Sequence, residues 1–175
     1  MFIRTKKIKK FEYAYKVKNV WSKKGTRQKV KGYLGRVYKF EKTKDIAFPD
    51  FISKIKKIKN VNEYIKKSKF NDIVLDLVKW ELLRHGFNVT NSKYRNKKII
   101  LEIKDNSIFN KKKEVVLMIN DGFLCGETIK NLLNFKAKED EEEIGIDLAN
   151  VFVGAGIGIE KDVFVKLFEK YFHAL

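Results

Sequence analysis

The sequence predicts an α+β fold, in which a small basic antiparallel β-meander is followed by a domain of helix, three strands and helices. Two observations lead to this prediction. Residues 11–20 alternate between apolar and polar side chains, which is typical of a half-exposed strand, and residues 68–85 repeat apolar side chains at helical spacing. The only proline, Pro49, lies between these segments. We therefore expect a basic β module at 1–45 and an α+β domain with C-terminal helices at 46–175.

Three segments of the first forty residues have the pattern of strands. Residues 2–8 predict a short strand, and residues 11–20 predict a longer one. Residues 26–40 predict one or two further strands, because Gly32 and Gly35 favour a bulge or a sharp bend within this segment. The result is a three- or four-stranded antiparallel meander with one aromatic face and many cations.

After residue 50 the pattern changes to helical repeats and short strands. Residues 51–66 predict one basic helix, or two short helices broken at Asn60. The helix at 68–85 has Ser68 or Asn71 as its expected N-cap. The other expected elements are a strand that begins at 87, strands at 97–104 and 113–119, and helices at 126–135, 141–153 and 160–173.

The composition excludes several classes of protein. Of 175 residues, 44% are hydrophobic and 13% aromatic, so a packed core is expected rather than global disorder. No run of 18 apolar residues is present and no secretory signal opens the chain, so we expect a cytoplasmic protein that spans no membrane. The single cysteine, Cys125, excludes an intramolecular disulfide and a cysteine-based zinc site. With only two histidines, no metal or cofactor is expected.

The positive charge is concentrated in the first two-fifths of the chain. Residues 1–70 hold 23 Lys and Arg against 5 Asp and Glu, a net charge of +18, whereas residues 71–175 hold 16 against 17. A segment this basic repels itself unless a polyanion binds it, and the phosphate backbone of DNA or RNA is the commonest such partner. An anionic membrane surface is the rival partner. A generally Lys-rich composition is the simplest alternative, but it predicts that Glu balances Lys throughout.

We therefore expect a non-enzymatic protein that grips the phosphate backbone of DNA or RNA without strong readout of base sequence. Four aromatic side chains are candidates for stacking on bases, namely Tyr13, Tyr15, Trp21 and Tyr33. Tyr13 and Tyr15 also lie in register with apolar neighbours, which favours a core-facing stripe instead. The expected nucleic-acid-binding residues are Arg4, Lys6, Lys7, Lys9, Lys10, Lys23, Lys24, Arg27, Lys29, Lys31, Tyr33, Arg36, Lys54 and Lys57.

The first forty residues carry a further pattern: a hydrophobic-Ile-Arg strand, a Tyr-rich strand, a charged turn with glycine, and an Arg-Gln followed by Tyr-Leu-Gly. The residues that form it are Phe2, Ile3, Arg4, Tyr13, Tyr15, Gly25, Arg27, Gln28, Tyr33, Leu34 and Gly35. This segment resembles the opening of many insertion-sequence transposases. The resemblance implies a small β module that holds nucleic acid. It implies no catalysis, because those enzymes carry a ribonuclease-H-like domain with three spaced acidic residues, a layout that this chain lacks.

Two other functions fit parts of the sequence. The helices at 141–153 and 160–173 suit a protein–protein adaptor or a homodimer, which requires an exposed apolar patch on them. Glu102 and Lys104 match the acid-x-lysine half of a Mg²⁺-dependent nuclease motif on a predicted strand. Residues 87–98 supply no second acid to hold the metal, so an active or degenerate nuclease is the weaker alternative.

The remaining signals favour structural roles. The glycine-rich residues 154–158 predict a flexible link between helices rather than a phosphate-binding loop. The acidic run at 139–143 predicts a solvated helix start, with docking onto the basic module as the alternative. Cys125 is expected to be a buried structural cysteine, and His85 to end a helix.

Overall fold

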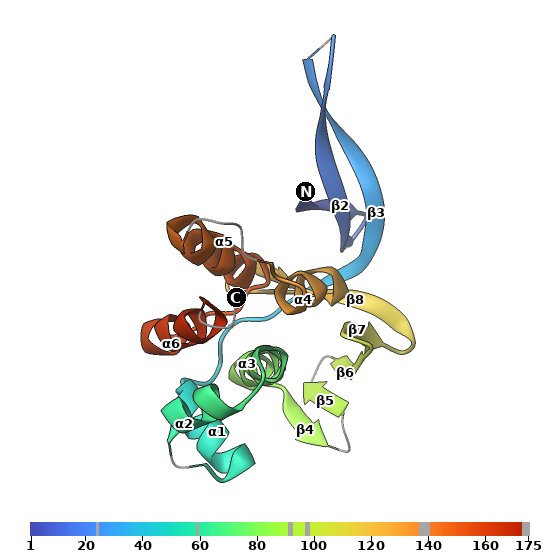
Figure 1. Cartoon of the computed structure of the whole chain (residues 1–175). Helices are drawn as coiled ribbons and strands as arrows, with labels where there is room; N and C mark the ends of the chain where they lie inside the picture. Colours follow the sequence, from blue (N-terminus) through green and yellow to red (C-terminus); the bar gives the residue numbers. More distant parts are fainter. Residues whose placement is uncertain (24, 59, 91–92, 97–98, 137–140, 173–175) are drawn as a thin grey trace.

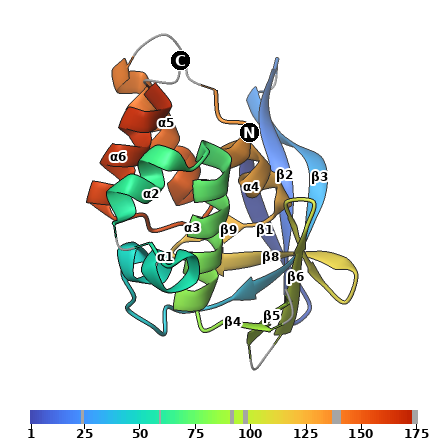
Figure 2. The same cartoon turned by 60° about the horizontal axis from the view of Figure 1, so that its bottom comes forward.

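A single β-sheet runs through the molecule, and Figure 2 shows the helices gathered on one side of it. The computed structural model describes the chain except residues 24, 59, 91–92, 97–98, 137–140 and 173–175. Within the described chain the sheet has nine strands in the order β1-β2-β3-β8-β7-β6-β5-β4, and β9 also pairs with β8. The strands are β1 (Phe2–Ile8), β2 (Phe11–Ser22), β3 (Gly25–Lys39), β4 (Asn88–Thr90), β5 (Lys93–Asn96), β6 (Ile99–Lys104), β7 (Ser107–Asn110), β8 (Lys113–Ile119) and β9 (Gly122–Leu124).

The helices complete a mixed α+β fold, which confirms the predicted class. They are α1 (Phe48–Lys56), α2 (Val61–Lys67), α3 (Phe70–Arg84), α4 (Gly126–Leu133), α5 (Glu141–Gly154) and α6 (Lys161–Phe172). The basic segment 51–66 contains two helices, because Asn60 caps α2 by accepting a hydrogen bond from the Asn62 amide at 2.9 Å. None of the described helices is long and apolar enough to cross a membrane.

The sequence prediction missed three strands and one cap. The expected strands correspond to β4, β6 and β8, whereas β5, β7 and β9 were not expected. Tight hairpins create β7 and β9: both residues of the pairs 105–106, 111–112 and 120–121 have positive φ, the geometry of a two-residue turn. None of these pairs contains glycine, and only the third is followed by one, Gly122. The N-cap of α3 is Lys69, which makes no side-chain capping bond, so packing of Phe70 rather than capping sets the start of this helix.

The first three strands form an antiparallel meander, as predicted. β3 has two residues without a partner in β2. Ala14 pairs with Gly35, but the next residue, Tyr15, pairs with Tyr33, so one residue of β3 is skipped. A second residue of β3 is skipped after Lys16. These irregularities lie beside Gly32 and Gly35, where the sequence predicted a bulge. Gly35 has a φ of +135°, and a Cβ built on it would lie 2.6 Å from the Glu114 carbonyl oxygen of β8.

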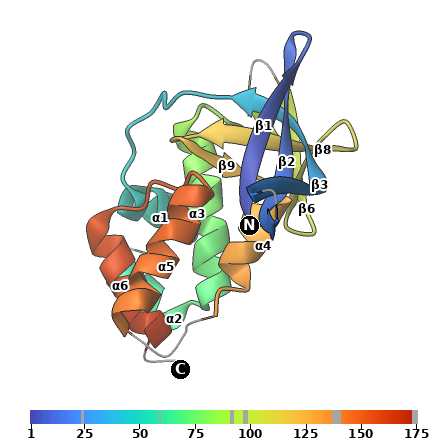
Figure 3. The same cartoon turned by 90° about the horizontal axis from the view of Figure 1, so that it is seen from above.

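The meander is continuous with the rest of the sheet, because Arg36–Lys39 of β3 pair in parallel with Val115–Met118 of β8. Residues 40–47 then run from β3 to α1 (Figure 3). Trp80 Nε1 donates a 2.8 Å hydrogen bond to the Ile46 carbonyl oxygen and so fixes this connection against α3. The division of the chain into modules at residue 45 stays a prediction.

The main hydrophobic core lies between the helices and strands β5 to β9, with Trp80, Phe48, Phe87 and Phe152 among its fully buried side chains. A second, small cluster joins β2 and β3 to the start of α4; its buried residues are Ala14, Val37, Val116 and Cys125. The meander therefore rests on the body through only a few apolar side chains. Most of its surface stays exposed to solvent.

Two buried acids tie the body together. Asp76 accepts hydrogen bonds from Tyr64 Oη and Lys79 Nζ, each at 2.7 Å. Glu81 is fully buried and accepts from Asn120 Nδ2 at 2.6 Å, and also from the Gly158 amide at 3.1 Å. The glycine-rich link at 154–158 is thus held in place rather than loosely attached. Its close packing against the β8–β9 turn, where a Cβ at position 156 would lie 2.4 Å from a carbonyl oxygen, requires glycine.

Candidate nucleic-acid interface

Residues 18–31 of β2 and β3 form a two-stranded ribbon, here called the arm, that projects from the body (Figure 1). β1 pairs with β2 only as far as Val17, and β8 pairs with β3 only from Arg36 onward. Between these limits the described residues of the arm pair only with each other. The hydrogen bonds of a third strand are therefore missing on both edges, and every described side chain of the arm is exposed.

The arm has two chemically different faces, because directly paired residues of antiparallel strands lie on the same side of a sheet. Asn19 pairs with Gln28, and Trp21 pairs with Thr26. These four residues define the amide face. The opposite side, the cationic face, consists of Lys18 paired with Lys29 and Val20 paired with Arg27. The alternation that predicted β2 thus places amides and cations on opposite sides of the arm. Amides are suited to contact bases, and cations are suited to contact phosphates.

The arm carries only positive charge. Residues 18–31 include six Lys and Arg and no Asp or Glu. No described cation of the arm forms an ion pair. Lys18 and Lys29 lie directly opposite each other, an arrangement of like charges that destabilises a sheet. The cost of this arrangement falls when an anion lies between the two ammonium groups.

An aromatic cluster adjoins the arm on the same side as the amide face. The ring of Tyr33 lies 5.5 Å from that of Tyr15 and 6.3 Å from that of Tyr13. Burial is the main cause that raises the pKa of Tyr33, and the neighbouring tyrosines raise it further, although 58% of this residue is exposed. Val17 of the expected core-facing stripe is buried, but Tyr13 and Tyr15 are half-buried and belong to neither hydrophobic core cluster, so the expectation is wrong for the two tyrosines. Ala14 of the same strand takes the buried position instead.

The structure brings some of the predicted cations together around this surface. Arg4 on β1 donates a hydrogen bond to Gln28 of the arm. Arg36 lies over the ring of Phe11 at 3.7 Å and over that of Tyr38 at 4.8 Å. Lys6 pairs with Tyr13, which places it on the same side as the aromatic cluster.

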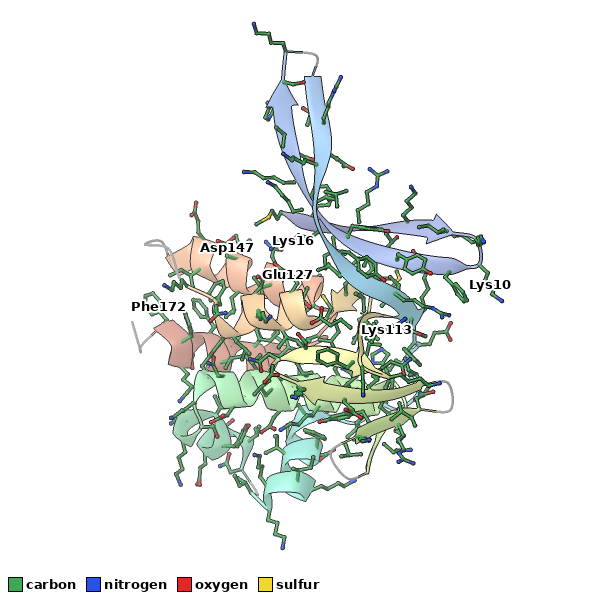
Figure 4. All side chains as sticks on the ribbon, turned by 90° about the vertical axis from the view of Figure 1, so that its right-hand side faces the viewer. Lys10, Lys16, Lys113, Glu127, Asp147 and Phe172 are labelled. Atoms are coloured by element: carbon green, nitrogen blue, oxygen red, sulfur yellow. The ribbon has the colours of Figure 1, made fainter. Side chains whose placement is uncertain are left out.

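Other predicted cations lie elsewhere. Lys7 points to the opposite side of the meander, where it faces Glu12, and the turn that contains Lys9 and Lys10 forms the far end of the β1–β2 hairpin (Figure 4). Lys23 precedes the tip of the arm, and Lys24 lies outside the described residues.

The helical lysines that were grouped with the meander are not near it. Lys54 and Lys57 are exposed at the end of α1, which Figures 1 and 4 place at the opposite end of the molecule from the arm. The expectation that the β module and the 51–66 segment form one grip was based on charge in the sequence alone. The link at 40–47 carries the chain across the body and so separates the two basic regions.

Acidic groups neutralise the base of the meander but not the arm. Lys16 forms an ion pair with Glu127 of α4, and both residues are labelled in Figure 4. Lys39 lies 3.1 Å from Glu12, whose pKa is lowered by hydrogen bonds from Thr5 and Lys39. Of the acidic run at 139–143, only the Glu143 side chain is described, and it is exposed. The described acids therefore leave the arm available to a partner.

The groups considered for catalysis do not assemble a site in the described chain. Glu102 lies on the exposed side of β6 and pairs with Lys93 at 3.0 Å, and Lys104 is exposed on the same strand. No group of three potential metal ligands occurs among the described residues. Cys125 is buried, as predicted, and burial raises the pKa of its thiol. His85 ends α3, as predicted, and is buried against Glu81.

The C-terminal helices expose a few aliphatic side chains, whereas the adaptor alternative requires an apolar patch. Ile146 and Val153 of α5 are seven residues apart and therefore share one side of that helix, and Val165 of α6 is also exposed. These are single side chains of the kind that most protein surfaces carry. The adaptor function stays a prediction.

Comparison of this chain with protein-family models, with curated proteins and with solved structures finds no match. The resemblance of the first forty residues to insertion-sequence transposases therefore stays a prediction. Sequence reasoning did not single out Lys18, Asn19 or Thr26 as site residues. Extending the alternation of 11–20 through the turn at Gly25 would have found them, because it assigns each residue of the arm to a face.

Proposed function

We propose that this protein binds nucleic acid, with the arm and the neighbouring side of β1–β3 holding the phosphate backbone. The observation that supports this most strongly is the arm itself, a ribbon with six cations, no acid, and no ion pair among its described residues. Phosphates satisfy such cations, and release of condensed counterions makes the binding favourable at low salt. The proposal includes a cytoplasmic location and no catalytic activity.

Charge geometry supports a polymeric anion over single ions. The paired Lys18 and Lys29, the tip residue Lys23, and Arg4 at the base of the arm lie along one projecting element. Phosphates repeat along a nucleic acid, so one molecule can satisfy several of these groups at once. The aromatic cluster and the Arg36 guanidinium next to the arm offer additional contacts with sugars and bases.

A salt titration tests this proposal. Binding of fluorescent duplex DNA, duplex RNA and single strands is measured by anisotropy over a range of salt concentrations. We expect log K to fall linearly with log salt, with a slope of about −0.9 for each phosphate contacted in duplex DNA. Replacing Arg27, Lys29 and Lys31 together with Gln reduces the size of this slope by up to about 2.7, if each contacts one phosphate.

A matched variant controls for net charge. Replacing Lys54, Lys57 and Lys66 with Gln removes the same charge from exposed positions on α1, its C-terminus and α2. This variant should keep the wild-type slope, because these residues lie at the other end of the molecule. Absence of binding to any nucleic acid at low salt overturns the proposal. Binding to phosphatidylserine vesicles but not to nucleic acid replaces it with the membrane alternative.

A further inference from the structure

On the basis of the proposed function, we infer that the target is double-stranded DNA and that the arm enters its major groove with the amide face against the base edges. This goes beyond backbone binding, because it assigns a readout of base sequence to four side chains of the arm. The inference depends on the shape of the arm and on the exposed side chains of its two faces.

The shape of the arm fits the major groove of B-form DNA. That groove is about 12 Å wide and 8.5 Å deep, and it admits a two-stranded ribbon. From Lys18 to Ser22 the ribbon extends roughly 14 Å, at about 3.4 Å per residue. The arm is therefore long enough to reach the base edges while the body stays outside the groove. The minor groove, about 6 Å wide, is too narrow for two paired strands with their side chains.

The amide face has the side chains that read base edges. Asn and Gln form paired hydrogen bonds with the adenine N6 and N7 atoms, and Thr contacts either a base atom or the thymine methyl group. Asn19, Thr26 and Gln28 are exposed on this face, and 82% of Trp21 is exposed beside them. Arg4 donates to the Gln28 side-chain oxygen, which orients this amide and leaves its nitrogen to donate to a purine N7.

The cationic face accounts for the phosphates when the amide face meets the bases. Lys18, Arg27 and Lys29 then point away from the base edges, toward the opening of the groove. Their long flexible stems allow the charged ends to reach the two phosphate chains that border the groove. The repulsion between the paired Lys18 and Lys29 is relieved because each can approach a different chain.

Other occupants fit the arm less well. The major groove of duplex RNA is deep and narrow, so a ribbon cannot read it. A single strand could stack on Trp21, which is 82% exposed, but Tyr13, Tyr15 and Tyr33 pack against one another, and one strand has no second phosphate chain for the opposite face of the arm. A second copy of the chain could pair with the free edges of the arm, but two arms with six cations each repel one another.

The test begins with selection of a preferred sequence from random duplex DNA at fixed salt. Affinities for the selected and a scrambled duplex are then compared in wild-type protein and in the Asn19→Ala/Gln28→Ala variant. We expect each lost paired contact to reduce the preference about five- to hundredfold, while the salt slope stays unchanged. Val20→Ala changes the opposite face of the same strand and should keep the full preference.

A second measurement locates the contact in the groove. Replacing selected adenines with 7-deazaadenine removes an acceptor that is present only in the major groove, so it should weaken binding of wild-type protein but not of the double variant. Emission from Trp21, isolated by a Trp80→Phe substitution, should change when duplex DNA binds.

The outcomes separate this inference from the proposed function. Absence of all nucleic-acid binding overturns both. Salt-dependent binding in which duplex RNA or single strands bind as tightly as duplex DNA overturns only the inference. The same holds if wild-type protein selects no sequence, or if Asn19→Ala/Gln28→Ala retains the full preference.

Discussion

The Gly35→Ala substitution should destabilise the protein, because a Cβ at position 35 would collide with the backbone of β8. Its φ of +135° is a conformation that side chains other than glycine rarely adopt, and forcing it costs about 1–3 kcal/mol. The added Cβ would also lie 2.6 Å from the Glu114 carbonyl oxygen and 3.0 Å from the Val115 Cα, both of which are backbone atoms. Displacing them costs about 1–3 kcal/mol more, so we expect a loss of about 2–6 kcal/mol in the free energy of unfolding.

Urea denaturation followed by Trp80 fluorescence measures this loss. Trp80 is fully buried, and a Trp21→Phe background removes the signal of the exposed tryptophan. Gly32→Ala is the matched control in the same strand, because a Cβ there meets no atom within 4 Å and the backbone is not strained. We expect this control to be neutral or to stabilise by about 0.4–1 kcal/mol. Equal stability of the two variants refutes the close approach of β3 and β8.

Three further predictions concern the body. Glu81→Ala removes a buried carboxylate that accepts hydrogen bonds from Arg84, Asn120 and the Gly158 amide, and should lower the free energy of unfolding by about 1.5–3 kcal/mol in urea titrations. Burial alone raises the pKa of Asp76, but hydrogen bonds from Lys79 and Tyr64 outweigh it and lower the pKa. Asp76 therefore stabilises the fold at pH values above its unfolded pKa of about 4, and this contribution is lost as the pH falls through the lower folded pKa. Asp76→Asn should therefore make the free energy of unfolding less dependent on pH in the acid range. Burial raises the pKa of the Cys125 thiol, so iodoacetamide at pH 8 should label it only as fast as the protein opens; fast labelling of native protein would contradict its burial.

Long elements with strong periodicity could be predicted from the sequence. The alternation of residues 11–20 identified β2, and the helical repeat of residues 68–85 identified α3 to within two residues at each end. The parallel pairing of β3 with β8 could not be predicted, because it joins segments far apart in the sequence and no local pattern reports it. The short strand β7 was missed because only one of its two turns, Asp105–Asn106, has residues typical of a hairpin turn, whereas the other, Lys111–Lys112, has none.

The candidate site was predicted in its charge but not in its geometry. The Lys and Arg content of the first 70 residues pointed to a polyanion, and the structure leaves Arg27 and Lys29 without ion pairs on the projecting arm. Which residues share a face depends on the strand register and on the bulges of β3, and neither is fixed by composition. The same register moved Tyr13 and Tyr15 away from the core, because Ala14 occupies the inward position.

The link between β3 and β8 also bears on how the chain folds during its synthesis. Arg36 leaves the ribosome long before Val115, its partner in the sheet, and contacts between such distant segments form slowly. Until β8 emerges, β3 has no strand of the body to pair with, and the meander consists only of β1, β2 and β3. The highly basic N-terminal segment thus spends this interval without its permanent neighbour, close to ribosomal RNA, and docks only when most of the chain has been made.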